Sequence, residues 1–232
     1  MKTFDDIFSI IESGTDNIQS IDYESIKNLN IFSNKDKELT AYHEAGHALI
    51  ALYYGYNVPR ITIKSRTNSL GAVHYTGQEG NYSRNINDVK EIVQISLAGI
   101  CAEKVKFHKY STGGSQDLEQ AKKIILHAIC EAGLGKEGPM YLGDMKFWSE
   151  QRKRNIEQEE KNIMNECFEI VENILSEHRL LLNELAQTLL DKKEISGSSI
   201  DYFKDKLISK PTFIIKQSIN LEETVHNKKD DS

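Results

Sequence analysis

Cysteine and proline are both scarce in this chain of 232 residues, with three of each. The cysteines are odd in number and include no C-x-x-C pair, which argues against a disulfide framework and against a metal site of paired cysteines. We therefore expect Cys101, Cys130 and Cys167 to be small buried side chains in a reducing cytoplasm.

Long apolar runs and an excess of basic residues are also missing. No apolar segment approaches the roughly 20 residues that a transmembrane helix needs. The N-terminus carries Asp5 and Asp6 where a signal peptide would have bases followed by apolar residues. The formal net charge is -6 and no cluster combines aromatic and basic side chains, which disfavours a nucleic-acid surface. The expected protein is cytoplasmic, with no membrane span and no nucleic-acid partner.

The chain does contain enough apolar mass for a folded core, since 39% of its residues are hydrophobic and 28% are charged. Apolar residues at helical spacing predict a mainly α fold of the α+β class, with helices that begin near residues 34, 87, 115, 149, 179 and 198. Alternating β-branched residues predict strands at 58–64 and 70–76, which would form a small sheet or hairpin beside the first helix.

Three regions are expected along the chain. Residues 1–32 are predicted to be an N-terminal appendage with short amphipathic pieces. Residues 33–210 would form one domain, and residues 211–232 a flexible C-terminal tail.

The first predicted helix carries the motif from which a function can be argued. Within it, His43 and His47 lie four residues apart, so both imidazoles project from one face, one turn apart. That spacing suits two nitrogens that bind one zinc ion, and Glu44 is placed to take a proton from a metal-bound water. The alternative is a partly buried helix with two incidental histidines.

A catalytic zinc ion needs a third protein ligand and one open position for water. An extended motif with a third histidine is excluded, because Ile50 and Tyr53 stand where it needs glycine and histidine. An acid shortly downstream is excluded as well, because residues 48–78 contain no aspartate or glutamate. The remaining candidates are His74, Glu79, Asp88, Glu91, Glu103, His108, Asp117 and later acids.

Asp117 is distinctive among these candidates, because it follows Gly113-Gly114 at the start of a predicted helix. A short carboxylate at such a corner would be rigidly placed, although an acid in a first helical turn also complements the helix dipole without any metal. The spacing favours Asp117 and leaves His74 and Glu103 as the next candidates.

The helix predicted from residue 87 has unusually small residues in its middle, 98–102. Gly99 costs about 1 kcal/mol relative to alanine inside a helix. Close approach of a neighbouring helix would offset this cost, and the helix with Ala45 and Gly46 is a suitable neighbour.

Several segments resemble the FtsH-type ATP-dependent metalloprotease family, in the same order along the chain. Thr40–Ile50 looks like the zinc helix of that family, and Ile61–Ile63 with the later Leu70-Gly71 is similar to its strand and following glycine. Leu97–Glu103 resembles its small-residue helix. Ser111–Leu118 resembles the segment that carries its third zinc ligand, an aspartate.

The resemblance extends over roughly residues 35–205 and implies a helical zinc-peptidase domain. It implies that His43, His47 and Asp117 bind Zn²⁺ and that Glu44 is the general base. The expected activity is that of a metallo-endopeptidase acting on peptides or unfolded proteins. An extended substrate would pair with the edge of one predicted strand, at 61–64 or 70–75.

The chain also departs from the family, whose members carry an AAA ATPase module and usually membrane anchors. No G-x-x-x-x-G-K-[ST] phosphate loop occurs here, so cleavage is expected without an ATPase on this chain, unless a separate ATPase or adaptor delivers substrates. The rival expectation is a catalytically silent binding or regulatory module that retains zinc. The oligomeric state is left open.

Overall fold

The computed structural model describes residues 34–64, 72–76, 84–143 and 145–208. The chain divides into two compact units, Met1–Asp36 and Lys37–Ser232. The expected appendage (1–32) and tail (211–232) lie outside the described residues.

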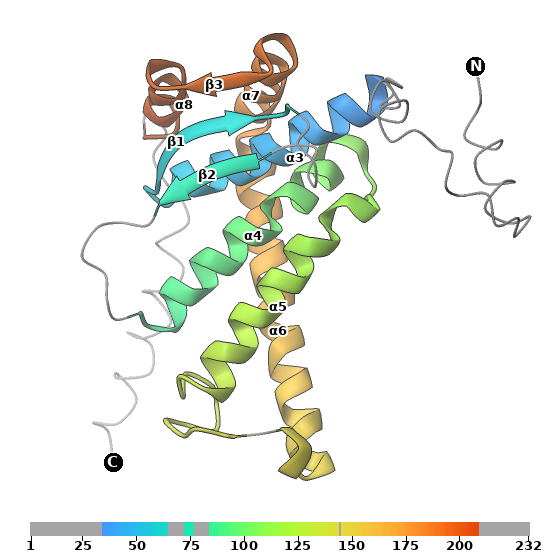
Figure 1. The fold of residues 1–232 in the computed structure, drawn as a ribbon, viewed down its shortest axis with the longest axis vertical. Coiled ribbons are helices and arrows are strands. Elements are labelled where there is room, and N and C mark those ends of the chain that lie inside the picture. The colour runs from blue at the N-terminus through green and yellow to red at the C-terminus, as the bar shows by residue number, and fades with distance from the viewer. Residues whose placement is uncertain (1–33, 65–71, 77–83, 144, 209–232) are drawn as a thin grey trace, which may run out of the picture. The chain divides into compact units, whose positions relative to one another are not determined.

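The described residues confirm the predicted mainly α fold with a small sheet (Figure 1). Each predicted helix is present, with two short 3-10 turns between them. The helical elements are α3 (Asn34–Tyr53), α4 (Ile86–Phe107), η2 (Thr112–Gly114), α5 (Ser115–Cys130), η3 (Met145–Phe147), α6 (Glu150–Glu177), α7 (Arg179–Lys192) and α8 (Ser198–Ile208).

Helix α4 begins slightly earlier than expected because Asn85 caps it. The Asn85 side chain accepts hydrogen bonds from the backbone N–H groups of Asn87 (2.8 Å) and Asp88 (3.3 Å). In return the Asp88 carboxylate accepts one from the Asn85 N–H (2.8 Å), which completes a capping box. The cap fixes the start of the helix that lies beneath the site described below.

Three antiparallel strands form the sheet, in the order β2-β1-β3. The predicted strands are β1 (Asn57–Thr62) and β2 (Ala72–Thr76), while β3 (Glu194–Ser196) was not predicted. Ile61 of β1 pairs with Val73 on one side and with Ile195 on the other. The expectation that β1 offers an edge to a substrate is therefore wrong, because both of its sides are already paired. Within the described residues β2 pairs with β1 alone, so its other side is the open one.

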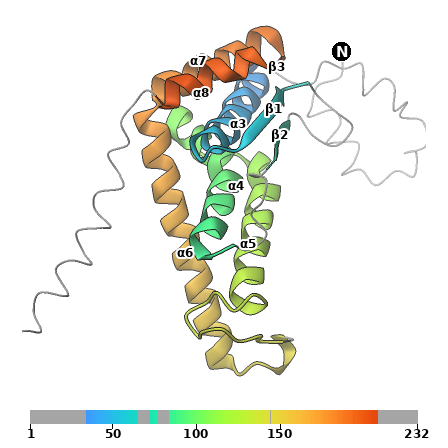
Figure 2. The ribbon, with the colours of Figure 1, turned by 90° about the vertical axis from the view of Figure 1, so that its left-hand side faces the viewer.

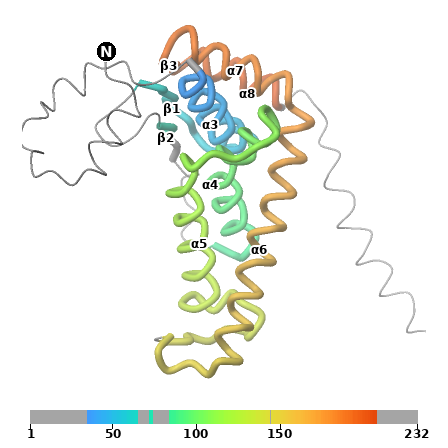
Figure 3. Tube along the Cα trace, turned by 90° about the vertical axis from the view of Figure 1, so that its right-hand side faces the viewer, coloured from blue at the N-terminus to red at the C-terminus, as the bar shows by residue number. Residues whose placement is uncertain are grey.

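Helices α4, α5 and α6 run side by side, with α7 and α8 near the sheet (Figures 2 and 3). Helix α3 lies against α4 and beside the sheet, as expected (Figure 1). The core between these elements is aliphatic, and its largest fully buried apolar side chains are Leu49, Ile50, Ile61, Val93, Ile95, Leu97, Ile125, Leu175, Leu182, Leu185 and Leu189.

Small residues let α3 approach α4 closely, as the sequence predicted. A Cβ atom added to Gly46 would lie 2.4 Å from the carbonyl oxygen of Ala98 and 2.6 Å from the Cβ of Ala102. Any larger residue at position 46 would push the two helices apart. This contact sets the distance between the histidine helix and α4.

Two other expectations can be compared with the structure. Cys101, Cys130 and Cys167 are all free and buried, as predicted. None of the helices in the described ranges combines the length and the apolar character that a bilayer crossing requires.

Candidate metal centre

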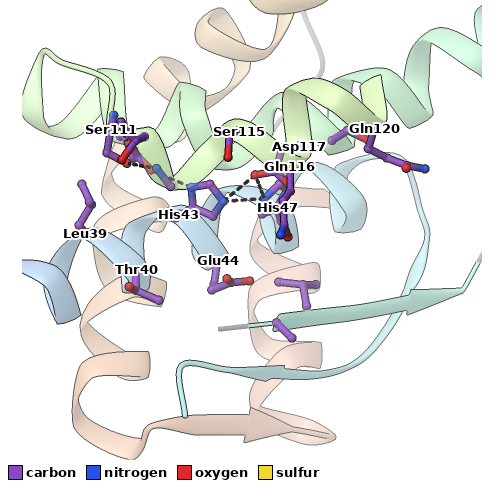
Figure 4. A pocket seen from close by; sticks show the side chains of 16 residues that line it. Leu39, Thr40, His43, Glu44, His47, Ser111, Ser115, Gln116, Asp117 and Gln120 are labelled. Atoms are coloured by element: carbon purple, nitrogen blue, oxygen red, sulfur yellow. Dashed lines mark hydrogen bonds and ion pairs between the residues drawn. The ribbon is translucent and has the colours of Figure 1, made fainter. Parts of the chain in front are cut away.

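Helix α3 places His43 and His47 on the face that is turned toward α4 and the start of α5 (Figure 4). Their rings pack edge to face, with centroids 4.8 Å apart and planes at 72°. The side chains are 14% and 12% exposed, so each ring is held within the fold while one edge reaches the pocket.

Asp117 reaches the same point from the first turn of α5. The preceding η2 turn is held by Ser111, whose hydroxyl accepts a hydrogen bond from the Gly113 N–H (3.1 Å). Gly114 is buried against α4, where an added Cβ would lie 2.3 Å from the Cγ1 of Ile100. The turn therefore sits directly on α4, which fixes the start of α5 and the direction of the Asp117 side chain.

Three potential ligand atoms converge at one point. The His43 Nε2 lies 2.9 Å from the Asp117 Oδ2 and 3.1 Å from the His47 Nε2, and the His47 Nε2 lies 3.6 Å from the Asp117 Oδ2. Around a tetrahedral zinc with bonds of about 2.0–2.1 Å, neighbouring ligand atoms are about 3.3 Å apart. These separations are close to that value, so the three atoms could bind one metal ion of that size together.

The other nitrogen of each imidazole is held by a buried acceptor. The His43 Nδ1 donates to the Glu103 Oε1 (2.8 Å), and the His47 Nδ1 donates to the carbonyl oxygen of Ile95 (2.7 Å). A proton on Nδ1 leaves the lone pair on Nε2, which is the tautomer that a metal ligand needs. Both rings are thus oriented and prepared to coordinate through Nε2.

Glu103 links the two halves of the centre. Its carboxylate is 1% exposed, and while Oε1 accepts from His43, Oε2 accepts from the backbone N–H of Ser111 (2.8 Å). One carboxylate therefore joins a histidine of α3 to the turn that leads to Asp117. Burial raises the pKa of Glu103, but the hydrogen bonds from His43 and Ser111 outweigh this effect and hold the pKa below its usual value.

The electrostatics of the cluster favour a cation. Burial by itself lowers the pKa of His43, but the hydrogen bonds with Asp117 and Glu103 outweigh it and raise the pKa to about 10. Burial raises the pKa of Asp117, but hydrogen bonds with His43 and His47 outweigh it and hold the pKa well below its usual range. The carboxylates of Asp117 and Glu103 thus stabilise a positive charge on His43, and the histidines keep Asp117 ionised as an anionic ligand atom.

Glu44 lies beside the cluster on α3 and lines the same pocket (Figure 4). Its side chain is buried, with 7% of the residue exposed. Burial raises the pKa of Glu44, an effect that the neighbouring His47 and His43 partly oppose. The two buried glutamates thus differ, because Glu103 is held as a charged acceptor while Glu44 accepts a proton more readily than an ordinary glutamate.

The pocket around these residues has a volume of about 560 Å³. One wall is formed by Ala72 and Val73 of β2, and the opposite wall by the η2 turn and the first turns of α5. The cluster lies between these walls, with Glu44 on the α3 floor (Figure 4). An elongated molecule lying along β2 would therefore pass over the three ligand atoms.

The structure brings together the four residues that the motif and the resemblance singled out, and it separates them from Glu103, Asp88 and His108. Glu103 contacts the far nitrogen of His43 instead of the convergence point. Asp88 belongs to the α4 cap, and His108 is the C-terminal cap residue of α4. The side chain of His74 and the whole of Glu79 lie outside the described residues, so neither can be placed.

Sequence reasoning missed the backbone groups that hold the centre, the Ile95 carbonyl and the Ser111 N–H. Every residue has such groups, so no residue type marks these two positions. Glu103 was singled out, but as a ligand and not as the acceptor that orients one.

Two histidines one helical turn apart, a distant aspartate and a buried glutamate beside them are an arrangement typical of metallopeptidase centres. Residues 30–202 match the sequence model of the family described as Peptidase family M41. The match spans well over half of the chain, and the chain belongs to this family.

Curated relatives agree with this assignment. The chain is 31% identical to a protein of Pelodictyon phaeoclathratiforme named ATP-dependent zinc metalloprotease FtsH. The aligned 184 residues cover 72% of this chain and 28% of the relative. A protein of the same name from Thermotoga maritima is 30% identical, over 73% of this chain and 31% of its own length. Another from Rickettsia felis is 34% identical, over 72% of this chain and 29% of its own length. The chain thus spans less than a third of the length of these relatives.

Proposed function

We propose that this chain is a zinc metallo-endopeptidase that hydrolyses peptide bonds in peptides and unfolded proteins. The observation that carries the proposal is the convergence of two Nε2 atoms and one carboxylate oxygen beside the buried Glu44, in a pocket walled by β2. His43, His47 and Asp117 would hold the zinc ion. The relatives named as zinc metalloproteases support the choice of metal.

A zinc ion in this position supplies an activated water and polarises the scissile carbonyl. The protein itself carries out the proton transfers. Glu44 accepts a proton from the attacking water and delivers it to the nitrogen of the leaving amine. Its raised pKa suits the first step, because a carboxylate that binds a proton more readily is a stronger base toward the attacking water.

The substrate would bind as an extended strand along the open side of β2. Backbone hydrogen bonds to β2 carry the affinity in this mode, so many sequences can bind. A folded domain cannot present such a strand, because its backbone groups are already paired. Unfolded segments are therefore the expected substrates, and folded proteins would need a separate ATPase or adaptor to deliver them.

A direct test uses purified, zinc-loaded protein and a permanently unfolded, fluorescently labelled casein-like substrate. We expect cleavage that stops when a chelator removes the metal and returns when zinc is added back. A tightly folded protein of similar size serves as the control and should remain intact. If the zinc-loaded protein binds the unfolded substrate but cleaves it at no length, the proposal fails and a binding or regulatory module that retains zinc takes its place.

A further inference from the structure

Gly99 lies at the point of α4 that faces both imidazoles. A Cβ atom added to Gly99 would lie 2.5 Å from the Cε1 and 2.5 Å from the Nε2 of His43, and 2.6 Å from the Nε2 of His47. Ordinary contacts between carbon and other heavy atoms are 3.5 Å or longer, so the two rings occupy the space that any side chain at position 99 would need.

The other closely packed glycines of the described residues have different neighbours. Gly46 meets the backbone of α4, with its added Cβ 2.4 Å from the Ala98 oxygen. Gly114 meets the side chain of Ile100. These two glycines allow helices and turns to pack, whereas Gly99 alone among the described glycines borders the nitrogens that converge on the metal position.

The rings cannot move aside and still bind one metal ion together. The His43 Nδ1 is held by Glu103 and the His47 Nδ1 by the Ile95 carbonyl, so each imidazole is fixed at its far edge. A side chain at position 99 must therefore either break one of these hydrogen bonds or spread the two Nε2 atoms away from Asp117. In either case three ligand atoms no longer surround one point.

We propose that Gly99 is a positioning residue for the metal centre, and that its lack of a side chain is required for metal binding and not for folding. The helix itself does not need glycine here, because alanine is the better helix former and Gly99 lies well inside α4. The atoms that an added methyl would meet belong to the Nε2 edges of the two imidazoles, and when no metal is bound these edges can tilt apart while each Nδ1 keeps its hydrogen bond. The added methyl group therefore weakens metal binding and leaves the fold in place.

The test compares Gly99→Ala with Gly46→Ala, since both add one methyl group to the same helix–helix contact. Zinc affinity is measured by competition with a chromophoric chelator, and the thermal unfolding of each zinc-free protein is measured separately. We expect Gly99→Ala to unfold close to the temperature of the parent, yet to bind zinc about 100-fold more weakly or worse, a loss at the upper end of those caused by disturbing ligand support. Gly46→Ala should instead lower the unfolding temperature of the zinc-free protein.

Cobalt(II) provides a readout that does not depend on activity. The parent should bind one cobalt with the visible absorption of a tetrahedral site, and Gly99→Ala should lack that absorption. Zinc binding by Gly99→Ala within about threefold of the parent would overturn the proposal, because a site that binds zinc with the methyl group present does not need the glycine. A zinc-free Gly99→Ala protein that unfolds well below the parent would also overturn it, since the glycine would then be needed for the fold.

Discussion

The replacement Glu103→Gln tests how the metal centre is held together. The carboxylate of Glu103 accepts two hydrogen bonds, from the His43 Nδ1–H and from the Ser111 N–H, both at 2.8 Å. Glutamine has the same shape but only one oxygen, so one of the two donors must face an NH₂ group. If the oxygen stays with Ser111, the NH₂ group favours the His43 tautomer with its proton on Nε2, where the metal would bind.

The expected loss can be estimated from this geometry. A charged hydrogen bond is removed from a buried group, and the remaining NH₂ group opposes the tautomer that binds metal. Loss of the partner that orients a histidine ligand typically costs 10- to 100-fold in metal affinity, or about 1.4–2.7 kcal/mol. Glu103→Gln should therefore retain the fold and bind zinc between about 10- and 100-fold more weakly.

The assay is competition for zinc with a chromophoric chelator at fixed pH, with unfolding by denaturant measured in parallel. Glu159→Gln is the matched control, because Glu159 is 8% exposed and also accepts a backbone N–H, that of Lys136 at 2.9 Å, but does not line the pocket of the metal centre. The control should lose stability and keep its zinc affinity. A Glu103→Gln protein that binds zinc as tightly as the parent would refute the role assigned to Glu103.

Four further predictions concern zinc binding and the fold. Because His43 in the zinc-free protein has a pKa of about 10, zinc binding at pH 8 should release close to one proton, measured by calorimetry in buffers of different ionisation enthalpy; a histidine with the ordinary value of 6.5 would release almost none. The same raised pKa predicts how the stability of the zinc-free protein changes with pH. Protonated His43 stabilises the fold fully below pH 6.5, and this contribution is lost as the pH rises toward 10. Unfolding by denaturant across that pH range would detect the loss. Removal of zinc should lower stability by about 4 kcal/mol relative to protein with free zinc at 1,000 times the dissociation constant, and an unchanged melting temperature would contradict binding at a folded site. Asn85→Ala removes the α4 cap and should cost about 1 kcal/mol in denaturant unfolding while zinc affinity stays unchanged.

The fold could be predicted from sequence wherever the signal is local. The helix with His43 and His47 has its ligand spacing, its apolar residues and its end at Tyr53 within one short stretch, and the stop signal Gly55 follows with a positive φ of 76°. Strand β3 has only three residues and no alternation to detect, since it exists through its pairing with β1. That missed strand also explains why β1 was mistaken for a possible edge.

The candidate site could be predicted only in part, because its parts are distant in sequence. Spacing alone left His74 and Glu103 beside Asp117 as third-ligand candidates, and the family resemblance selected among them. The structure puts Asp117 at the convergence point and turns Glu103 toward the far nitrogen of His43. That difference depends on how the η2 turn is seated on α4, which no single segment of the sequence encodes.

The proposed activity is cleavage of peptide bonds at a zinc ion, with Glu44 as the base. The most direct measurement determines zinc per chain together with cleavage of an unfolded protein, for the parent and for Glu44→Gln. We predict one zinc per chain in both proteins, with cleavage by the parent and only background cleavage by the variant, because glutamine cannot accept the proton of the attacking water. A Glu44→Gln protein that binds zinc and cleaves as fast as the parent would contradict the account.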